Sequence, residues 1–182
     1  MKNAIILHGT ENNPNDNWFP WLKKELERKG FRVWVPFLPC SDKPNVDKYN
    51  SFLLPDWQYN SDTFLIGHSS GAVAILSLLQ NLPKGTVINK AILVAGFKDN
   101  LEWDALDGLF IHSYDWEKIK RRCKEFVFIH SDNDPYVPME HGKFLHGKLG
   151  GRLIVKKGQK HFSISSFGEK YKQFPLILDL LS

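Results

Sequence analysis

Short apolar runs alternate along the chain with longer segments in which apolar residues have helical spacing. The runs show no polar alternation, which is typical of strands that are buried on both faces of a sheet. They predict six strands, over residues 4–7, 31–35, 63–66, 91–94, 126–130 and 153–155. The pattern therefore indicates a sheet with helices packed on both faces.

The segments between these runs have the spacing of amphipathic helices. In residues 18–29, apolar side chains recur at Trp18, Leu22 and Leu26, and Gly30 ends the pattern. Further helices are predicted over 46–54, 70–81, 115–123 and 138–149 and near the C-terminus. Alternating strands and helices predict a single α/β domain over residues 1–182, with three layers and about six mostly parallel strands.

The third predicted strand runs directly into Gly67-His68-Ser69-Ser70-Gly71. A Gly-x-Ser-x-Gly pattern between a strand and a helix is typical of a sharp turn that exposes the central serine, with glycines where the helix packs close to the strand. Ser69 lies midway between the two glycines and is the predicted nucleophile. The alternative is a glycine-rich turn in which both serines cap the helix.

Other reactive residues also follow predicted strands: segment 8–10 after the first, Asp134 after the fifth and His161 after the sixth. Because the carboxyl ends of parallel strands meet at one edge of a sheet, we expect these residues to converge on Ser69. A serine hydroxyl needs a base to take its proton during attack on a carbonyl, and a carboxylate must orient that base. His161 and Asp134 are the candidates for these roles.

A developing oxyanion must be met by backbone N–H donors. The nearest candidate is the N–H of Ser70, at the start of the helix after Ser69. The second is expected in the loop after the first strand, most simply at Thr10. His8 is a candidate for shaping that loop, and His68 is expected to be packed beside the nucleophile.

These segments resemble the α/β-hydrolase superfamily: the strand followed by His8-Gly9, the Gly-His-Ser-Ser-Gly turn, Asp134-Pro-Tyr-Val-Pro and Gly-x-x-His161-Phe. The small size and the first strand close to the N-terminus make the chain similar to the retinoblastoma-binding protein 9 family of small serine hydrolases. The resemblance implies a trimmed α/β-hydrolase core without the superfamily's first two strands, in which the six strands have the order 2-1-3-4-5-6. It also implies a triad of Ser69, Asp134 and His161, and serine hydrolase or carboxylesterase activity on poorly defined substrates.

Two carboxylates compete for the third position of the triad. Matching the Asp-x-x-Val-Pro motif favours Asp134 over Asp132. Asp132 is expected to cap or shape the turn.

The substrate pocket is predicted from aromatic residues near these loops. Trp18 and Phe162 stand next to catalytic loops in sequence, and the irregular stretch 95–114 is long enough to act as a lid. Trp103 and Phe110 in this stretch are expected either to overhang Ser69 or to pack on the sheet edge. Because this stretch is the only candidate lid and is short, we expect a small or shallow site that accepts short acyl groups.

Composition narrows the classes of partner. The 182-residue chain is 42% hydrophobic and has a formal charge of +4, and its densest basic run, 118–124, reads as a solvated helix face rather than a nucleic-acid or membrane surface. Neither cysteine has metal-ligand spacing, and no cofactor or metal is expected. The apolar run at 4–7 is too short for a signal peptide, which favours a cytoplasmic location.

The sequence thus predicts hydrolysis of a small carboxylic ester, thioester or amide through an acyl-enzyme on Ser69. Two alternatives stay open. One is an acyltransferase that uses the same triad, and the other is a non-catalytic module on the same fold that binds a protein partner.

Overall fold

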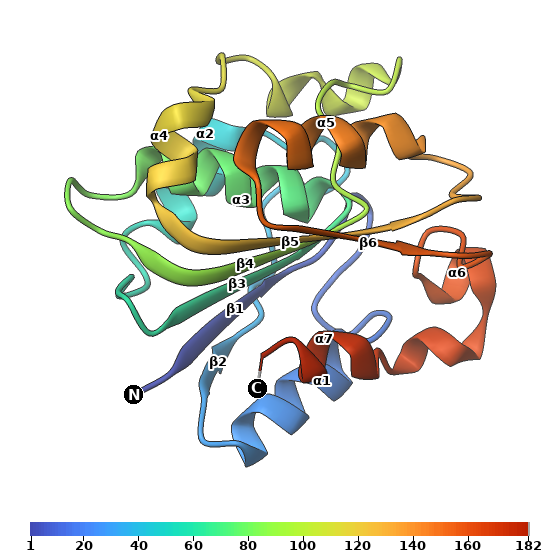
Figure 1. The fold of residues 1–182 in the computed structure, drawn as a ribbon, viewed down its shortest axis with the longest axis horizontal. Helices are drawn as coiled ribbons and strands as arrows, with labels where there is room; N and C mark the ends of the chain where they lie inside the picture. Colours follow the sequence, from blue (N-terminus) through green and yellow to red (C-terminus); the bar gives the residue numbers. More distant parts are fainter. Residues whose placement is uncertain (182) are drawn as a thin grey trace.

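The computed structural model describes residues 1–181, in which one six-stranded sheet separates two layers of helices (Figure 1). The strand order is β2-β1-β3-β4-β5-β6, and every neighbouring pair is parallel. The predicted order and layering are therefore confirmed. The strands are β1 (Asn3–Leu7), β2 (Arg32–Trp34), β3 (Thr63–His68), β4 (Ile88–Val94), β5 (Cys123–Ser131) and β6 (Arg152–Lys156).

Two groups of helices cover the sheet (Figure 1). One face carries α2 (Val46–Leu53), α3 (Ser70–Asn81), α4 (Trp116–Arg121) and α5 (Met139–Leu149), together with the 3-10 helix η1 (Asp104–Leu109). The other face carries α1 (Phe19–Arg28) and α7 (Pro175–Asp179). The short helices α6 (Ile164–Phe167) and η2 (Glu169–Lys172) lie between β6 and α7.

The central strands supply side chains to both layers, because successive residues of a strand point to opposite faces. In β1, Ile5 and Leu7 belong to the core under α3, whereas Ala4 and Ile6 belong to the core under α1 and α7. Burial of every β1 residue explains why the sequence shows a continuous apolar run.

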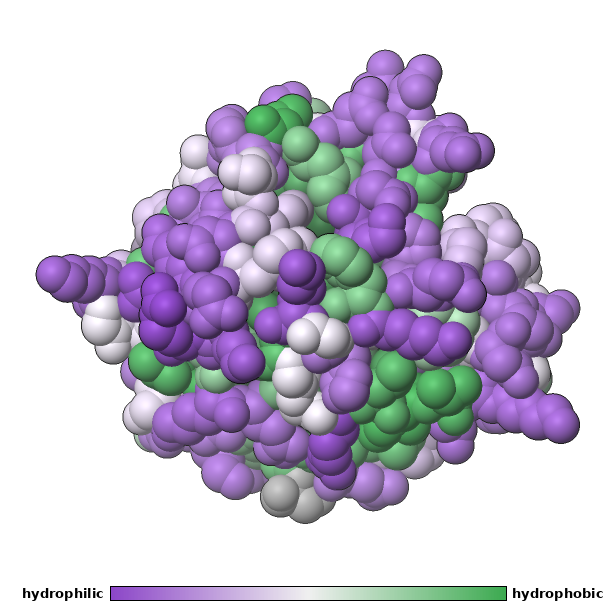
Figure 2. All heavy atoms as spheres, turned by 45° about the horizontal axis from the view of Figure 1, so that its top comes forward, coloured by the Kyte–Doolittle hydropathy of each residue, from purple (hydrophilic) through white to green (hydrophobic). Residues whose placement is uncertain are grey.

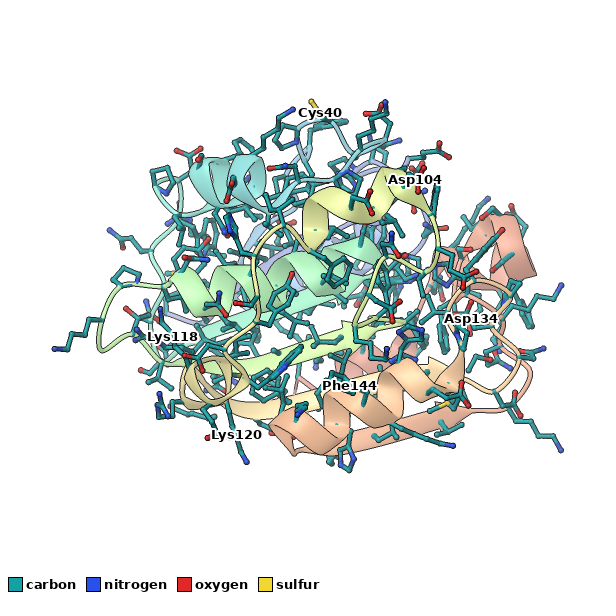
Figure 3. The ribbon with its side chains drawn as sticks, turned by 90° about the horizontal axis from the view of Figure 1, so that it is seen from above. Cys40, Asp104, Lys118, Lys120, Asp134 and Phe144 are labelled. Atoms are coloured by element: carbon teal, nitrogen blue, oxygen red, sulfur yellow. The ribbon has the colours of Figure 1, made fainter. Side chains whose placement is uncertain are left out.

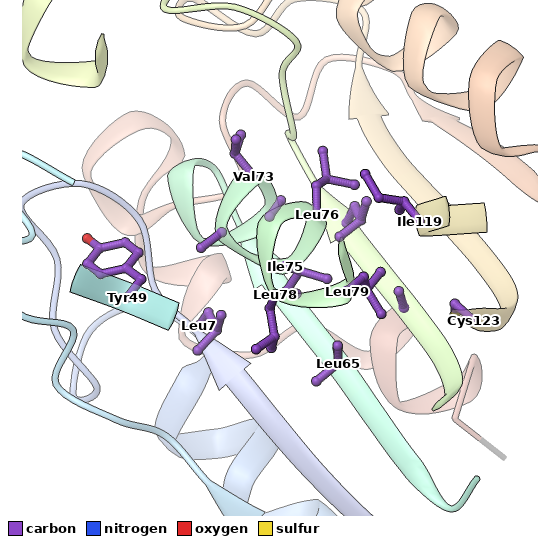
Figure 4. Packing of buried hydrophobic residues seen from close by; sticks show 14 of the residues in the cluster. Leu7, Tyr49, Leu65, Val73, Ile75, Leu76, Leu78, Leu79, Ile119 and Cys123 are labelled. Carbon is purple, nitrogen blue, oxygen red and sulfur yellow. The ribbon is translucent and has the colours of Figure 1, made fainter. Parts of the chain in front are cut away.

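Helix α3 is buried along almost its whole length, from Ser70 to Leu79. Figure 4 shows its side chain Leu78 directed toward Leu7 of β1 and Leu65 of β3. Neighbouring helices cover its remaining sides, with α2 packed against it and α4 close by. The helix that follows Ser69 is therefore fixed by packing on several sides.

The surface above this layer is mainly hydrophilic, with hydrophobic residues in separate patches (Figure 2). Among residues 1–181, few large apolar side chains are strongly exposed. They include Phe37, Trp103 and Tyr136.

Two element boundaries differ from the predictions. The helix predicted over 115–123 ends at Arg121, and Cys123 instead opens β5. The sheet ladder explains this end, because the Ile88 N–H donates to the carbonyl of Arg122 at 2.9 Å. At the C-terminus, α7 forms where a helix was predicted, and the short helices α6 and η2 precede it. The irregular stretch 95–114 contains η1.

The two glycines around Ser69 are required by close packing of backbones. A Cβ on Gly71 would lie 2.4 Å from the carbonyl oxygen of Leu7, and one on Gly67 would lie 2.6 Å from the carbonyl oxygen of Gly71. Such distances are far inside van der Waals contact, and both obstacles are backbone atoms. The elbow can therefore form only when both positions lack a side chain.

Replacement of Gly71 by alanine is expected to lower the free energy of unfolding by about 3 kcal/mol or more, because α3 must move away from β1. Gly147 in α5 is the matched control, since a Cβ there meets nothing within 4 Å. Gly147→Ala should stabilise the protein by about 0.5–1 kcal/mol. Urea denaturation of both variants checks this. Equal stability of the two variants would contradict the packing account.

Candidate active site

The candidate nucleophile lies on the sharp turn between β3 and α3. Ser69 has φ 56° and ψ −124°, in a region that L-residues rarely adopt. Its N–H donates to the carbonyl of Val94 at 2.8 Å, so the turn is tied to the neighbouring strand β4. Backbone strain of this kind persists only where the surrounding structure over-determines it.

The candidate base and acid form a hydrogen-bonded pair. His161 Nδ1 lies 2.8 Å from Asp134 Oδ2, and the two side chains are 10% and 1% exposed. The other carboxylate oxygen, Oδ1, accepts the backbone N–H groups of Tyr136 and Val137 at 2.9 and 3.1 Å. With the carboxylate ionised, Nδ1 carries the proton and Nε2 keeps a lone pair.

Asp132, the rival acid, makes a different contact. Its Oδ1 accepts the N–H of Gly158 at 2.7 Å, and the residue is exposed. It therefore joins the loop after β5 to the loop after β6 and has the turn-shaping contact expected from the sequence. Figure 3 marks Asp134 in the loop after β5, beyond the end of that strand.

The two candidate oxyanion donors are adjacent. Thr10 Oγ1 donates to Ser70 Oγ at 2.9 Å, which holds the loop after β1 against the start of α3. Ser70 is the first residue of α3, so its N–H has no acceptor within the helix. The positive end of the helix dipole adds to the attraction for an anion at this point.

His8 forms hydrogen bonds that hold the loop after β1. Its Nδ1 lies 2.9 Å from the carbonyl of Gly9, and its Nε2 accepts the N–H of Leu38 at 3.1 Å. Burial lowers the pKa of His8, which favours the neutral ring that this bonding pattern needs. Its contacts are those expected of a residue that shapes the loop.

A cavity of about 550 Å³ opens at this edge of the sheet. Ser69, His161 and Thr10 all border it. One wall is apolar, whereas the loop residues opposite are mostly polar. The apolar residues are Phe97, Leu101, Trp103, Leu106 and Val137, and the polar ones include Glu11, Asn12, Ser163 and Ser165.

Three of the four predicted pocket residues lie outside this cavity. Trp18 and Phe162 are fully buried in the core under α1 and α7, because the chain turns away from the site at both positions. Phe110 packs against the opposite core beside Phe97. Only Trp103 borders the cavity as predicted.

Other residues that were not predicted as site residues also border the cavity, and Tyr136 among them contacts the candidate base. The residue is 59% exposed, and its ring meets the His161 ring edge-on, with centroids 5.0 Å apart. The available signal was its place in Asp-Pro-Tyr-Val-Pro, directly after the candidate acid. Glu11, two residues after Gly9, places a carboxylate in the cavity lining.

Within residues 1–181, no group of three or more His, Cys, Asp and Glu side chains is arranged to hold a metal ion. In the same part of the chain, every helix is too short or too polar to cross a membrane.

Comparison with known proteins gives two relatives that span nearly the whole chain. The YdeN protein of Bacillus subtilis (strain 168) is 29% identical over 183 residues, which cover 100% of this chain and 95% of YdeN. Serine hydrolase RBBP9 of Rattus norvegicus is 26% identical over 171 residues, which cover 91% and 90% of the two chains.

Solved structures show the same similarity in their folds. The crystal structure of the B. subtilis ydeN gene product matches with a TM-score of 0.87 at 28% identity, over 100% of this chain and 97% of that one. Esterase PE8 matches with a TM-score of 0.59 at 18% identity, over 88% and 84%, and so shares the fold. Residues 4–182 match the family described as Serine hydrolase. The chain therefore belongs to the Serine hydrolase family and has the α/β-hydrolase fold.

Proposed function

We propose that this protein hydrolyses small carboxylic esters, or related thioesters and amides, through an acyl-enzyme on Ser69. The observation that carries the proposal is the 2.8 Å contact of His161 Nδ1 with Asp134 Oδ2, because His161 borders the same cavity as Ser69. A histidine whose Nδ1 is held by a buried carboxylate presents Nε2 as a base.

In the first half of the reaction, Ser69 Oγ bonds to the carbonyl carbon of the substrate and its proton passes to Nε2 of His161. The oxyanion that forms is stabilised by the N–H of Ser70 and by the N–H of Thr10. His161 returns the proton to the leaving group as the bond to it breaks. Water then attacks the acyl carbon and gives a proton to His161. As the bond between the acyl carbon and Ser69 Oγ breaks, His161 returns this proton to Oγ, which releases the acid and regenerates the Ser69 hydroxyl.

The cavity favours short acyl groups. Its apolar lining residues suit a hydrocarbon chain: Leu106 and Val137 are nearly inaccessible to solvent, and Trp103 is 45% exposed. A volume of about 550 Å³ that is shared with the leaving group lies in the range of small-molecule sites, which suits a small ester.

Hydrolysis of p-nitrophenyl acetate, butyrate, octanoate and laurate tests this assignment. We expect kcat/KM to be highest for acetate or butyrate. Trp103→Ala should raise KM for butyrate relative to acetate, on the order of fourfold for each methylene that the indole covers. Phe37→Ala is the control, because Phe37 is an exposed aromatic residue outside the cavity lining. A maximum at laurate would contradict the proposed substrate size.

A further inference from the structure

The loop that carries His161 is strained on both sides of this residue. Lys160 has φ 50° and Phe162 has φ 54°, so the two residues that flank the candidate base both have a left-handed backbone conformation. Each such residue costs of order 1–3 kcal/mol and needs contacts from the rest of the fold to hold it.

Side chains from three other parts of the chain supply these contacts. Asn133 Oδ1 accepts the N–H of Lys160 at 2.8 Å. Trp18 Nε1 donates to the carbonyl of Phe162 at 3.1 Å. His68 Nε2 lies 2.8 Å from the carbonyl oxygen of His161 itself. Trp18 thus holds the loop from the core instead of lining the pocket.

The contact of His68 differs from the other two because it joins the nucleophile's own neighbour to the base. His68 is the last residue of β3 and directly precedes Ser69, and it lies 93 positions before His161. The two rings lie with centroids 4.8 Å apart. One short bond therefore fixes the backbone of the base relative to the turn that carries the nucleophile.

The protonation state of His68 suits this contact. The ring is only 1% exposed, and burial, followed by the nearby His161 ring, lowers its pKa to about 3. A neutral imidazole has a single N–H, and a carbonyl partner requires that proton on Nε2. Nδ1 then keeps its lone pair and has no hydrogen-bond partner within residues 1–181.

We propose that His68 is a positioning residue. Its Nε2–H donates to the carbonyl of His161 and thereby keeps the base in position to accept the proton of Ser69. The inference rests on the proposed hydrolase function. A shift of about 1 Å in a catalytic group can lower the rate by about 100-fold. Loss of the bond should therefore lower kcat by about 10- to 100-fold and leave KM for p-nitrophenyl butyrate nearly unchanged.

Three substitutions separate this role from simple core packing. In His68→Gln, the side-chain amide can place an N–H near the position of Nε2. In His68→Asn, the amide is too short to reach the carbonyl, and His68→Leu fills the space without a donor. The measurements are kcat and KM for the butyrate ester, the rate of labelling by a fluorophosphonate, and the melting temperature of each variant.

We expect His68→Gln to keep kcat and the labelling rate within a few-fold of the wild type, while His68→Asn and His68→Leu lose about 10- to 100-fold in both. Equal kcat values in all three variants, whether unchanged or equally reduced, would overturn the positioning role. A rise in KM at constant kcat would overturn it as well. A wild-type protein that neither labels nor turns over the ester would instead refute the proposed function.

Discussion

Replacement of Ser69 by alanine is expected to lower kcat/KM for p-nitrophenyl butyrate by about 10⁴- to 10⁶-fold, because no other group on the elbow can form the acyl-enzyme. The fold should be retained, since Ser69 contributes backbone contacts to the turn and alanine keeps them. Steady-state kinetics checks the loss, and circular dichroism checks the fold.

Ser70→Ala is the matched control for this variant. The proposed role of Ser70 is its backbone N–H, which alanine retains, although the hydrogen bond from Thr10 is lost. We therefore expect a reduction of at most about 10-fold, the scale of one weakened supporting hydrogen bond. If Ser70→Ala cost more than Ser69→Ala, the two serines would have to exchange roles.

The second large effect is expected at the carboxylate. Asp134→Asn should lower kcat by about 10⁴-fold, because the amide can donate to Nδ1 of His161 and then stabilises the tautomer that has no lone pair on Nε2. The shape of the side chain and much of its hydrogen bonding to Tyr136 and Val137 can remain, so stability should change much less than activity.

Asp132→Asn provides the comparison, since both acids lie in the same loop. Its amide oxygen can still accept the N–H of Gly158, the contact that Asp132 makes in the structure. We expect kcat to stay within a few-fold of the wild type. A larger loss in Asp132→Asn than in Asp134→Asn would contradict the assignment of the acid.

The sheet could be predicted from sequence because its central strands are buried on both faces. Every residue of β1 and β3 is buried, and their middle parts, residues 4–7 and 64–66, appear as unbroken apolar runs. The strand order was predicted with the resemblance to the α/β-hydrolases, and it places the loop after β1 beside the Gly-x-Ser-x-Gly turn. The ends of helices and strands were harder to predict. At Cys123, for example, the pairing of β5 with β4 determines where α4 ends.

The candidate catalytic residues could be selected for a related reason. They follow strands directly, and the carboxyl ends of parallel strands meet at one edge, so sequence position fixes their approximate place in space. The structure adds what position alone could not show: the carboxylate that reaches His161 is Asp134, and Asp132 reaches Gly158 instead.

The pocket was poorly predicted because nearness in sequence does not fix the direction of a side chain. Phe162 follows His161 directly, yet the left-handed conformation of Phe162 sends its ring into the core beneath the sheet. Trp18 likewise points inward. Tyr136 borders the cavity because the turn after Asp134 presents it there.

The most direct test of the account is mass spectrometry of the folded protein after treatment with a fluorophosphonate. We expect a single stoichiometric adduct on Ser69. The adduct should be absent from Ser69→Ala and should form much more slowly in Asp134→Asn. An unlabelled wild-type protein, or an adduct that persists in Ser69→Ala, would contradict the claim that Ser69 is an activated nucleophile.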